Sequence, residues 1–448
     1  MKIKNYVFLI AGLAALFVPS ALGAEAAVRM LGIFLGSIWL WITCPIEIGS
    51  VACLAALCLL PGVTPANVFS ASFGSSTILF LIFSFLLTYA LSTTGVLRRV
   101  ALRFIDNKMA KKNVYLFMGA YFLSMLFIGS FMAPTTVFIL YFGLVNEIFS
   151  LLGLEKGDPL ARRMMVGTGF FASISCAMTP IAHTFPLMAL GYYETATGEV
   201  ISYVAYLRYA LPIGLLLAVL AYGLLCIRLK NGYDFSAVRF ERTKWSGKEI
   251  FSVLVFCAVV LCWLAVGISP KAFAGLNALG TAWPAMIGCV ILAAAGCLSI
   301  KDGFARGVSW SAIILCAATL AMGSFLTKDE FGIMPAVSAF MTPRLESFNI
   351  LLLIVAFAVV MTNLISNIVT TTVSFNLFVP LLLASALYSP VNATIAIGIC
   401  ASLAYALPSA IAHIALCGSS GWATNRDMLK YGSVMIALSI VVVYLIMA

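Results

Sequence analysis

Charged residues are scarce in this sequence: they make up 9% of its 448 residues, whereas hydrophobic residues make up 63%. A soluble core of this length cannot bury so much apolar surface, so the composition excludes a soluble globular enzyme. Apolar runs of about 20 residues, the thickness of the bilayer hydrocarbon, recur along the whole chain. The sequence therefore predicts an all-α polytopic membrane protein that resides in the lipid bilayer.

Three further absences narrow the function. The 12 cysteines never form a C-x-x-C pair and lie in apolar segments, which argues against a disulfide framework or a zinc site. No H-E-x-x-H motif and no carboxylate pair accompanies the histidines, so we expect no enzymatic activity and no cofactor other than a possible sodium ion. The net charge of +10 falls in short loops between spans, where it orients the chain. We therefore expect no nucleic-acid partner.

The positions of Lys and Arg predict the orientation of the chain, because cytoplasmic loops carry most of the positive charge. With the N-terminus in the cytoplasm, the largest basic cluster, Arg98 to Lys112, reaches the cytoplasmic side. This arrangement leaves all but five of the 26 lysines and arginines on that side of the cytoplasmic membrane. The expected spans are 5–22, 27–43, 46–61, 76–97, 164–190, 204–227, 249–270, 281–299, 308–326, 392–418 and 429–447, with 331–347 along the outer interface.

Two apolar stretches, 113–155 and 348–390, are about twice as long as one span. We interpret each as a re-entrant helical hairpin, the first entered from the cytoplasm and the second from outside. The middle of the first, Ser130 to Val137, aligns without a gap with the middle of the second, Ser366 to Val373. Such inverted-topology repeats are typical of secondary transporters.

A second matched pair follows each hairpin. Ala172 opens an Ala-Ser pair and is followed by His183, and Ala401 opens another and is followed by His413; these are the only two histidines. Nearby prolines predict broken helices in the spans 164–190 and 392–418. The N-termini of broken helices offer N–H groups to an anion, and their unwound carbonyls can bind a cation.

These patterns divide the chain into four parts. Residues 1–112 form the first scaffold spans, and 113–203 form the first transport repeat with its hairpin and broken span. Residues 204–347 form the second scaffold half, and 348–448 form the second transport repeat with the final span.

Several segments resemble one family of anion transporters. They are Trp39 to Pro45, Thr94 to Arg99, and Ala401 to Pro408 with the later Asp427 to Lys430. Together they resemble the divalent anion/sodium symporter family, the dicarboxylate, citrate and sulfate transporters of solute carrier family thirteen. The resemblance implies a homodimer of ion-transporter-superfamily architecture that carries a di- or tricarboxylate or a related oxyanion with sodium by an elevator movement.

That family has a Ser-Asn-Thr motif at each hairpin tip. Here the second tip keeps Ser366 and Asn367 but has Ile368 instead of threonine, and the first tip, from Ser130 to Met132, lacks the asparagine. The resemblance implies a sodium site at the second tip with oxygen ligands from Thr362, Ser366, Asn367 and the backbone near Ala410. The expected substrate-binding residues are Ser130, Thr135, Thr136, Thr179, His183, Thr184, Ser366, Asn367, Thr370, Thr371, Ala410 and His413.

Two alternatives remain open at this point. Histidine has an ordinary pKa near 6.5, so His183 and His413 also allow proton coupling or exchange of anions. A passive anion channel is a further alternative, because hairpins and helix dipoles also occur in channels.

Overall fold

The computed structural model is helical throughout its described residues, with no strand among them. It describes residues 3–181, 183–229, 232–236, 238–240, 244–326, 328–331, 339, 343, 349–385 and 387–448. The predicted interfacial segment 331–347 therefore lies almost entirely outside the described residues.

The helices of the first half are α1 (Ile3–Ala21), α2 (Ala26–Thr43), α3 (Ile46–Leu57), α4 (Pro65–Ala71), α5 (Ser76–Thr93), α6 (Val96–Ile105), η1 (Ala110–Lys112), α7 (Val114–Gly129), α8 (Pro134–Leu151), α9 (Pro159–Ala177), α10 (Thr184–Thr197) and α11 (Tyr203–Cys226). Those of the second half are α12 (Gly247–Ile268), α13 (Ala274–Ala278), α14 (Ala282–Ala294), α15 (Ile300–Asp302), η2 (Gly303–Gly307), α16 (Trp310–Leu326), η3 (Asp329–Phe331), α18 (Ile350–Leu364), α19 (Asn367–Ser385), α20 (Pro390–Cys400), α21 (Ala412–Ser419) and α22 (Asn425–Met447).

The predicted hairpins and broken helices are confirmed. Each double-length apolar stretch forms two helices that pack on each other, α7 with α8 around a tip at 130–133 and α18 with α19 around a tip at 365–366. The following span is broken in both halves, between α9 and α10 and again between α20 and α21. Proline restricts the backbone and lacks an N–H group, which explains breaks beside Pro180 and Pro408.

Other boundaries differ from the prediction. The expected span 46–61 ends as a helix at Leu57, because the chain turns at Pro61 and Gly62, where φ is +74°. The basic segment that we placed in a loop forms helix α6, whose apolar residues lie on one face. Among the described residues, seven helices are long and apolar enough to cross a membrane, and the bent pair 300–307 and 310–326 makes an eighth. Three of the six shorter apolar helices in the described ranges are arms of hairpins or a half of a broken span, namely α7, α18 and α20.

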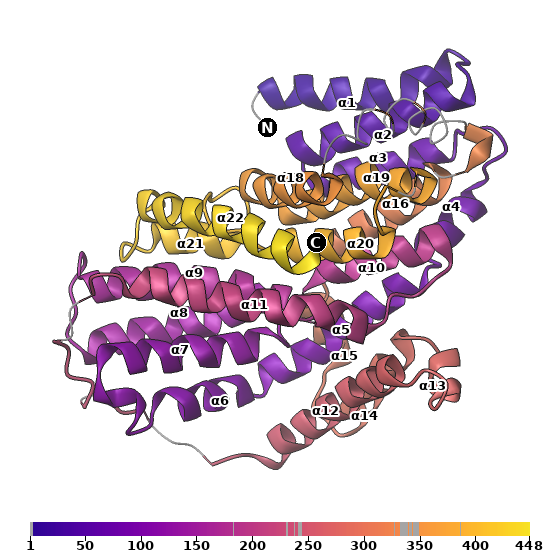
Figure 1. Ribbon diagram of the computed structural model, residues 1–448. Helices are drawn as coiled ribbons and strands as arrows, with labels where there is room; N and C mark the ends of the chain where they lie inside the picture. The colour runs from indigo at the N-terminus through magenta and orange to yellow at the C-terminus, as the bar shows by residue number, and fades with distance from the viewer. Residues whose placement is uncertain are drawn as a thin grey trace.

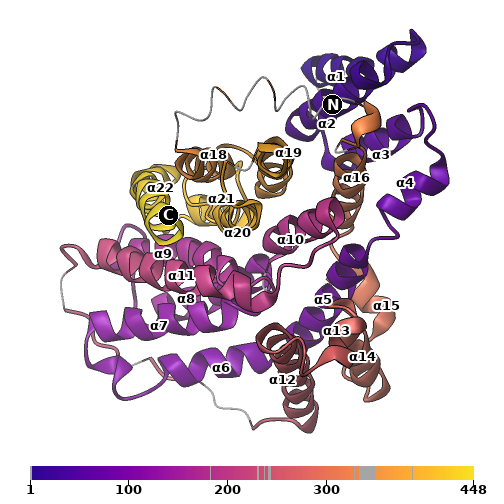
Figure 2. The same ribbon diagram turned by 45° about the vertical axis from the view of Figure 1, so that its right-hand side comes forward.

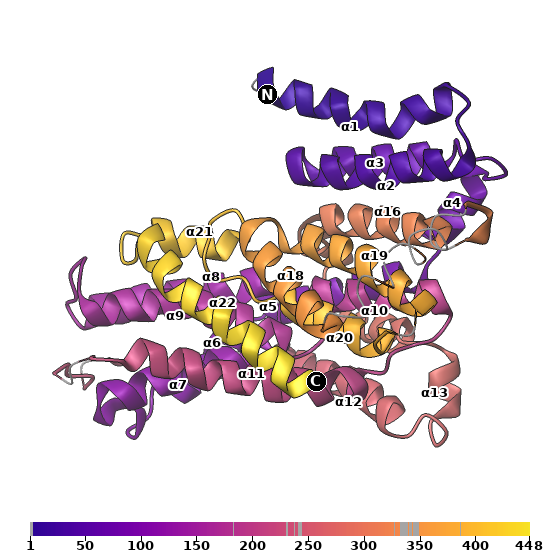
Figure 3. The ribbon, with the colours of Figure 1, turned by 45° about the horizontal axis from the view of Figure 1, so that its top comes forward.

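The helices form two groups. In one group, α9 packs on α7, α8 and α11, while α20 packs on α18, α19 and α10 (Figure 1). In the other, α2 and α3 pack between α1 and α16, α16 also contacts α4 and α5, and α12 and α14 pack on α5. This group meets the hairpins at α19, which contacts α2 and α16 (Figure 3). Helix α10 contacts both α20 and α16, so it lies at the boundary between the groups (Figure 2). The tips and breaks meet at this boundary.

Candidate anion site

A cavity of about 510 Å³ lies where both hairpin tips and both broken helices meet. One wall consists of the irregular segments and helix starts at 133–136, 183–185, 366–368 and 408–412. The opposite wall consists of residues of α5, of the end of η2 and of the start of α16. The cavity therefore separates the hairpin group of helices from the other group.

Four helices begin at this cavity. Ala133, His183 and Ile411 precede α8, α10 and α21, and none of these three helices has a side-chain cap. Helix α19 begins there at Asn367. By contrast, a side chain caps each of α5, α7, α9, α11, α12, α18, α20 and α22. Starts without a side-chain cap also occur at α2, α3, α6, α13 and α14, but those do not line the cavity.

The uncapped starts give the cavity a positive potential. The first N–H groups of a helix have no acceptor within the helix, and the helix dipole places partial positive charge at the same end. At α8 the N–H groups of Thr135 and Thr136 are of this kind, because the first ladder bond runs from Val137 to the carbonyl of Ala133. The described lining contains no carboxylate, and its one formally charged residue is Arg306. Such an environment suits an anion.

The second hairpin tip carries a side chain without partners. Asn367 is 1% exposed, yet neither its Oδ1 nor its Nδ2 has a hydrogen-bond partner within the described part of the chain. A buried amide that lacks partners costs free energy unless a ligand or water supplies them. Because Asn367 also lines the cavity, its amide is available to a ligand there.

The residues just before this tip hold the break between α20 and α21. Asn363 donates from Nδ2 to the carbonyl of Leu403 (3.0 Å) and accepts at Oδ1 from the backbone N–H groups of Tyr405 (2.7 Å) and Ala406 (3.0 Å). Thr362 donates to the carbonyl of Ala401 (2.7 Å). These bonds satisfy backbone groups that no helix can satisfy, so they fix the unwound segment that lines the cavity.

Each histidine pairs with a serine from the other repeat. Ser173 on α9 lies 2.9 Å from Nε2 of His413 and donates to the carbonyl of Ala404 (2.6 Å). Its hydroxyl hydrogen is thus engaged, which assigns the donor role to Nε2–H of His413. Ser402 lies 3.2 Å from the carbonyl of Gly398 and 3.1 Å from Nδ1 of His183. The two pairs therefore use different ring nitrogens, Nε2 of His413 and Nδ1 of His183.

The structure brings about half of the expected site residues to the cavity. Seven line it: Thr135, Thr136, His183, Thr184, Ser366, Asn367 and Ala410. The others lie behind the wall: Ser130, Thr179, Thr362, Thr370, Thr371 and His413. Of these, Thr179 donates to the carbonyl of Ser130, and His413 is fully buried. Thr179, Thr362 and His413 bond across to other segments, whereas the hydroxyls of Ser130, Thr370 and Thr371 bond carbonyls of their own helix.

No sequence pattern predicted the residues of the opposite wall. Thr88, Tyr89 and Ser92 of α5 line the cavity, as do Arg306 and Ser309. From the sequence, Arg306 is only one of the basic residues that orient the chain. Its place beside the tips depends on packing between distant helices, and no local pattern indicates that.

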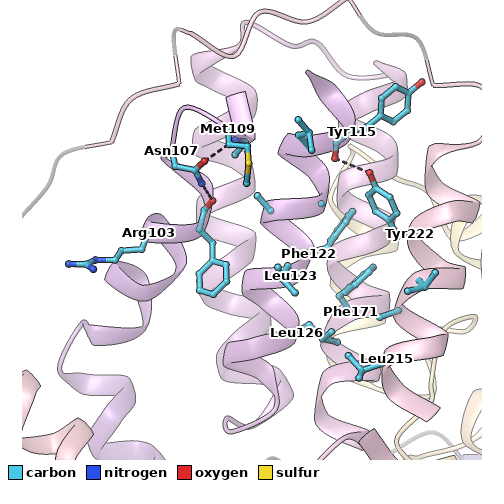
Figure 4. Close-up of a pocket in the computed structure, with 17 residues that line it drawn as sticks. Arg103, Asn107, Met109, Tyr115, Phe122, Leu123, Leu126, Phe171, Leu215 and Tyr222 are labelled. Carbon is cyan, nitrogen blue, oxygen red and sulfur yellow. Dashed lines mark hydrogen bonds between the residues drawn. The ribbon is translucent and has the colours of Figure 1, made fainter. Parts of the chain in front are cut away.

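A larger cavity of about 690 Å³ lies elsewhere, in a groove along α6, α7, α9 and α11 (Figure 4). Its lining is almost wholly apolar, with side chains such as Phe122, Leu123 and Phe171. Its one charged residue, Arg103, points away from these side chains in Figure 4. The apolar lining offers few hydrogen-bond donors, so the groove is not a candidate for an anion.

The two helical hairpins and the two broken helices meet at one cavity. This arrangement defines a membrane transporter built from inverted repeats. The model of the citrate transporter family matches residues 38–407, and the chain belongs to that family. It is 24% identical over 375 residues, 81% of this chain and 79% of the relative, to an uncharacterized transporter of Haemophilus influenzae. It is 26% identical over 236 residues to the inorganic phosphate transporter PHO87 of Saccharomyces cerevisiae, which covers 51% of this chain but only 24% of the yeast protein.

The fold is also similar to a solved structure. The YdaH transporter of Alcanivorax borkumensis superposes with a TM-score of 0.58 over 85% of this chain and 86% of its own, at 12% sequence identity. The predicted fold class is therefore confirmed, and the family supports a multi-pass transporter of small anions.

Proposed function

We propose that this protein is a secondary active transporter that carries a small di- or tricarboxylate, or a related oxyanion, together with sodium across the cytoplasmic membrane. The observation that carries the proposal is the cavity itself, where uncapped helix starts converge and the described lining contains no carboxylate. The N–H groups of Thr135 and Thr136 and the amide of Asn367 would hold the carboxylate oxygens of the substrate. The family description, citrate transporter, supports a carboxylate.

Sodium would bind beside the second tip. Ser366, Asn367 and the backbone of Ala410 line one cavity and present the oxygen atoms that a hard cation prefers. The hydroxyl of Thr362 donates to a carbonyl just behind them, so its oxygen can still accept or coordinate. A sodium ion there would offset the charge of the anion.

The transport movement would be of the elevator type. The hairpin group would shift relative to the group of α1–α5 and α12–α16, and would carry the tips and the bound anion with it. The resemblance to divalent anion/sodium symporters supports this movement, a homodimer and a cytoplasmic N-terminus. The cavity lies between the two groups, as such a movement requires.

A second candidate is proton-coupled transport or anion exchange. It is favoured by His183, which lines the cavity while its Nδ1 is held by Ser402. An imidazole in this place could take up a proton together with the anion, because its ordinary pKa lies near the physiological range.

Uptake into proteoliposomes distinguishes these functions. Labelled citrate, succinate and sulfate would be offered under an imposed sodium gradient, under a proton gradient, and with substrate on the opposite side. Accumulation driven by sodium is the expected result. Accumulation driven only by protons, or flux only in exchange, would favour the second candidate, in which the histidines couple transport to protons or to exchange. Downhill flux without accumulation would identify a channel.

A further inference from the structure

Arg306 is the one formally charged residue in the described lining of the cavity, and it belongs to the wall that carries no hairpin tip. It lies in η2, which leads into α16 at a bend of 72°. Its side chain is exposed, and no ion pair joins it to a carboxylate in the described ranges. We propose that Arg306 forms a capture subsite, which binds the anion at the cavity before the tips take it over.

The packing of η2 explains how Arg306 reaches the cavity. A Cβ atom at Gly303 would lie 2.6 Å from Cδ2 of Leu86, and one at Gly307 would lie 2.7 Å from Cβ of Tyr89. The two glycines therefore allow η2 to lie directly on α5, whose residues form part of the same wall. The turn is of the π type, closed by a bond from the N–H of Val308 to the carbonyl of Gly303 (3.0 Å). Single π turns are frequent at functional sites.

The charge of Arg306 attracts an anion over a longer distance than the partial charges at the helix N-termini do. Partial charges at a helix N-terminus fall off within the first turn, whereas a full charge facing a cavity attracts anions from farther away and raises their rate of binding. A guanidinium also matches the paired oxygens of a carboxylate or a phosphate. The subsite would therefore select small carboxylates and phosphate over neutral solutes.

This inference rests on the proposed function, because it assigns Arg306 to the wall that stays fixed while the tips move. An anion carried away with the tips would leave Arg306 behind. The guanidinium would then strengthen binding on one side of the membrane only, the side to which this cavity opens. The substrate KM on that side should depend on Arg306, and the KM on the opposite side should not.

The first test measures equilibrium binding of citrate, succinate and inorganic phosphate to the purified full-length protein. The variants are Arg306→Gln and Arg306→Lys, with Arg103→Gln as a matched control that removes a charge beside the apolar groove. Ionic strength is varied with choline chloride at constant sodium, and thermal melting checks that each variant is folded. At low ionic strength we expect Arg306→Gln to weaken binding by about tenfold, and at high ionic strength to weaken it little, because salt screens an exposed charge.

The outcomes of the binding test distinguish failure of the capture subsite from failure of the proposed function. Arg306→Lys should keep most of the affinity, because it keeps the charge, and Arg103→Gln should bind like the wild type. If the wild type binds these anions and Arg306→Gln binds them equally at low ionic strength, the capture subsite is overturned and the proposed function stands. If the wild type binds none of the three anions, the proposed function fails and the subsite fails with it.

The second test measures exchange across oriented proteoliposomes, with the citrate concentration varied on one side at a time. Arg306→Gln should raise the KM by about tenfold on one side and leave the other unchanged. An equal rise of the KM on both sides would mean that Arg306 supports the structure of the protein and does not capture the anion, and it would overturn the proposal.

Discussion

Oγ of Ser173 lies 2.9 Å from Nε2 of His413, so a serine of the first repeat contacts the histidine beside the helix break of the second repeat. The reciprocal pair, Ser402 with Nδ1 of His183, does the same for the first (3.1 Å). The pairs differ in their surroundings, because His183 lines the cavity whereas His413 is fully buried and its Nδ1 has no partner in the described chain. Both repeats therefore make a serine–histidine pair with the other repeat, but only the histidine of the first repeat lines the cavity.

Replacing the two serines should give unequal losses of stability. Ser173→Ala leaves both nitrogens of a buried imidazole and the carbonyl of Ala404 without partners, so we expect a loss of about 2 kcal/mol. Ser402→Ala should cost less, because water in the cavity can bond His183. Thermal melting in detergent measures both. Equal losses would contradict the assignment of His183 to the cavity wall.

Asn363→Ala and Asn367→Ala should separate stability from binding. Asn363 holds four backbone groups (the carbonyls of Val359 and Leu403 and the N–H groups of Tyr405 and Ala406), so its loss should lower the free energy of unfolding by about 3 kcal/mol. Asn367 has no partner to lose, so its variant should melt like the wild type but take up anion at least about tenfold more slowly. Melting and uptake are measured on both variants. Normal uptake by Asn367→Ala would contradict its assignment to the site.

Thr136→Pro tests whether the backbone itself binds the anion. Proline removes the N–H group but is tolerated in the first turn of a helix, as Pro186 already is in α10. We expect a folded protein whose affinity for anion falls by about tenfold. Thr136→Ala, which removes the hydroxyl and keeps the N–H group, is the control and should bind more tightly than the proline variant. The reverse order would assign binding to the hydroxyl.

Two neighbouring arginines on α6 should contribute very differently to stability. Arg98 pairs with Glu147 at 2.8 Å, but both side chains are more than one third exposed, so Arg98→Gln should cost at most about 1 kcal/mol. Arg99 pairs at 3.1 Å with Glu249, whose side chain is only 3% exposed. Arg99→Gln should therefore cost about 3 kcal/mol, because it leaves a buried carboxylate without its partner. Denaturation monitored by intrinsic fluorescence compares the two variants.

Much of the fold could be predicted because its signals are local. Double-length apolar stretches, prolines and the alignment of Ser130 with Ser366 predict the hairpins and the broken helices. The second tip was also predicted, since Ser366 and Asn367 are adjacent in the sequence and line the cavity.

The remaining features arise from tertiary contacts that no local pattern contains. The Ser173–His413 pair joins residues 240 positions apart, and Arg306 reaches the cavity only because Gly303 and Gly307 fit against α5. The sequence likewise suggested two equivalent histidines, whereas packing leaves only His183 at the cavity.

The crossed serine and histidine pairs also bear on the origin of the repeats. Each half of the chain lacks the partner for its own histidine and supplies the partner for the other. Two antiparallel copies of one half-length chain would form two such pairs through the same ring nitrogen, whereas here one pair uses Nε2 and the other Nδ1, so the two halves have diverged at this contact. The two pairs thus tie the halves of the chain together across their helix breaks, one at the wall of the cavity and one behind it.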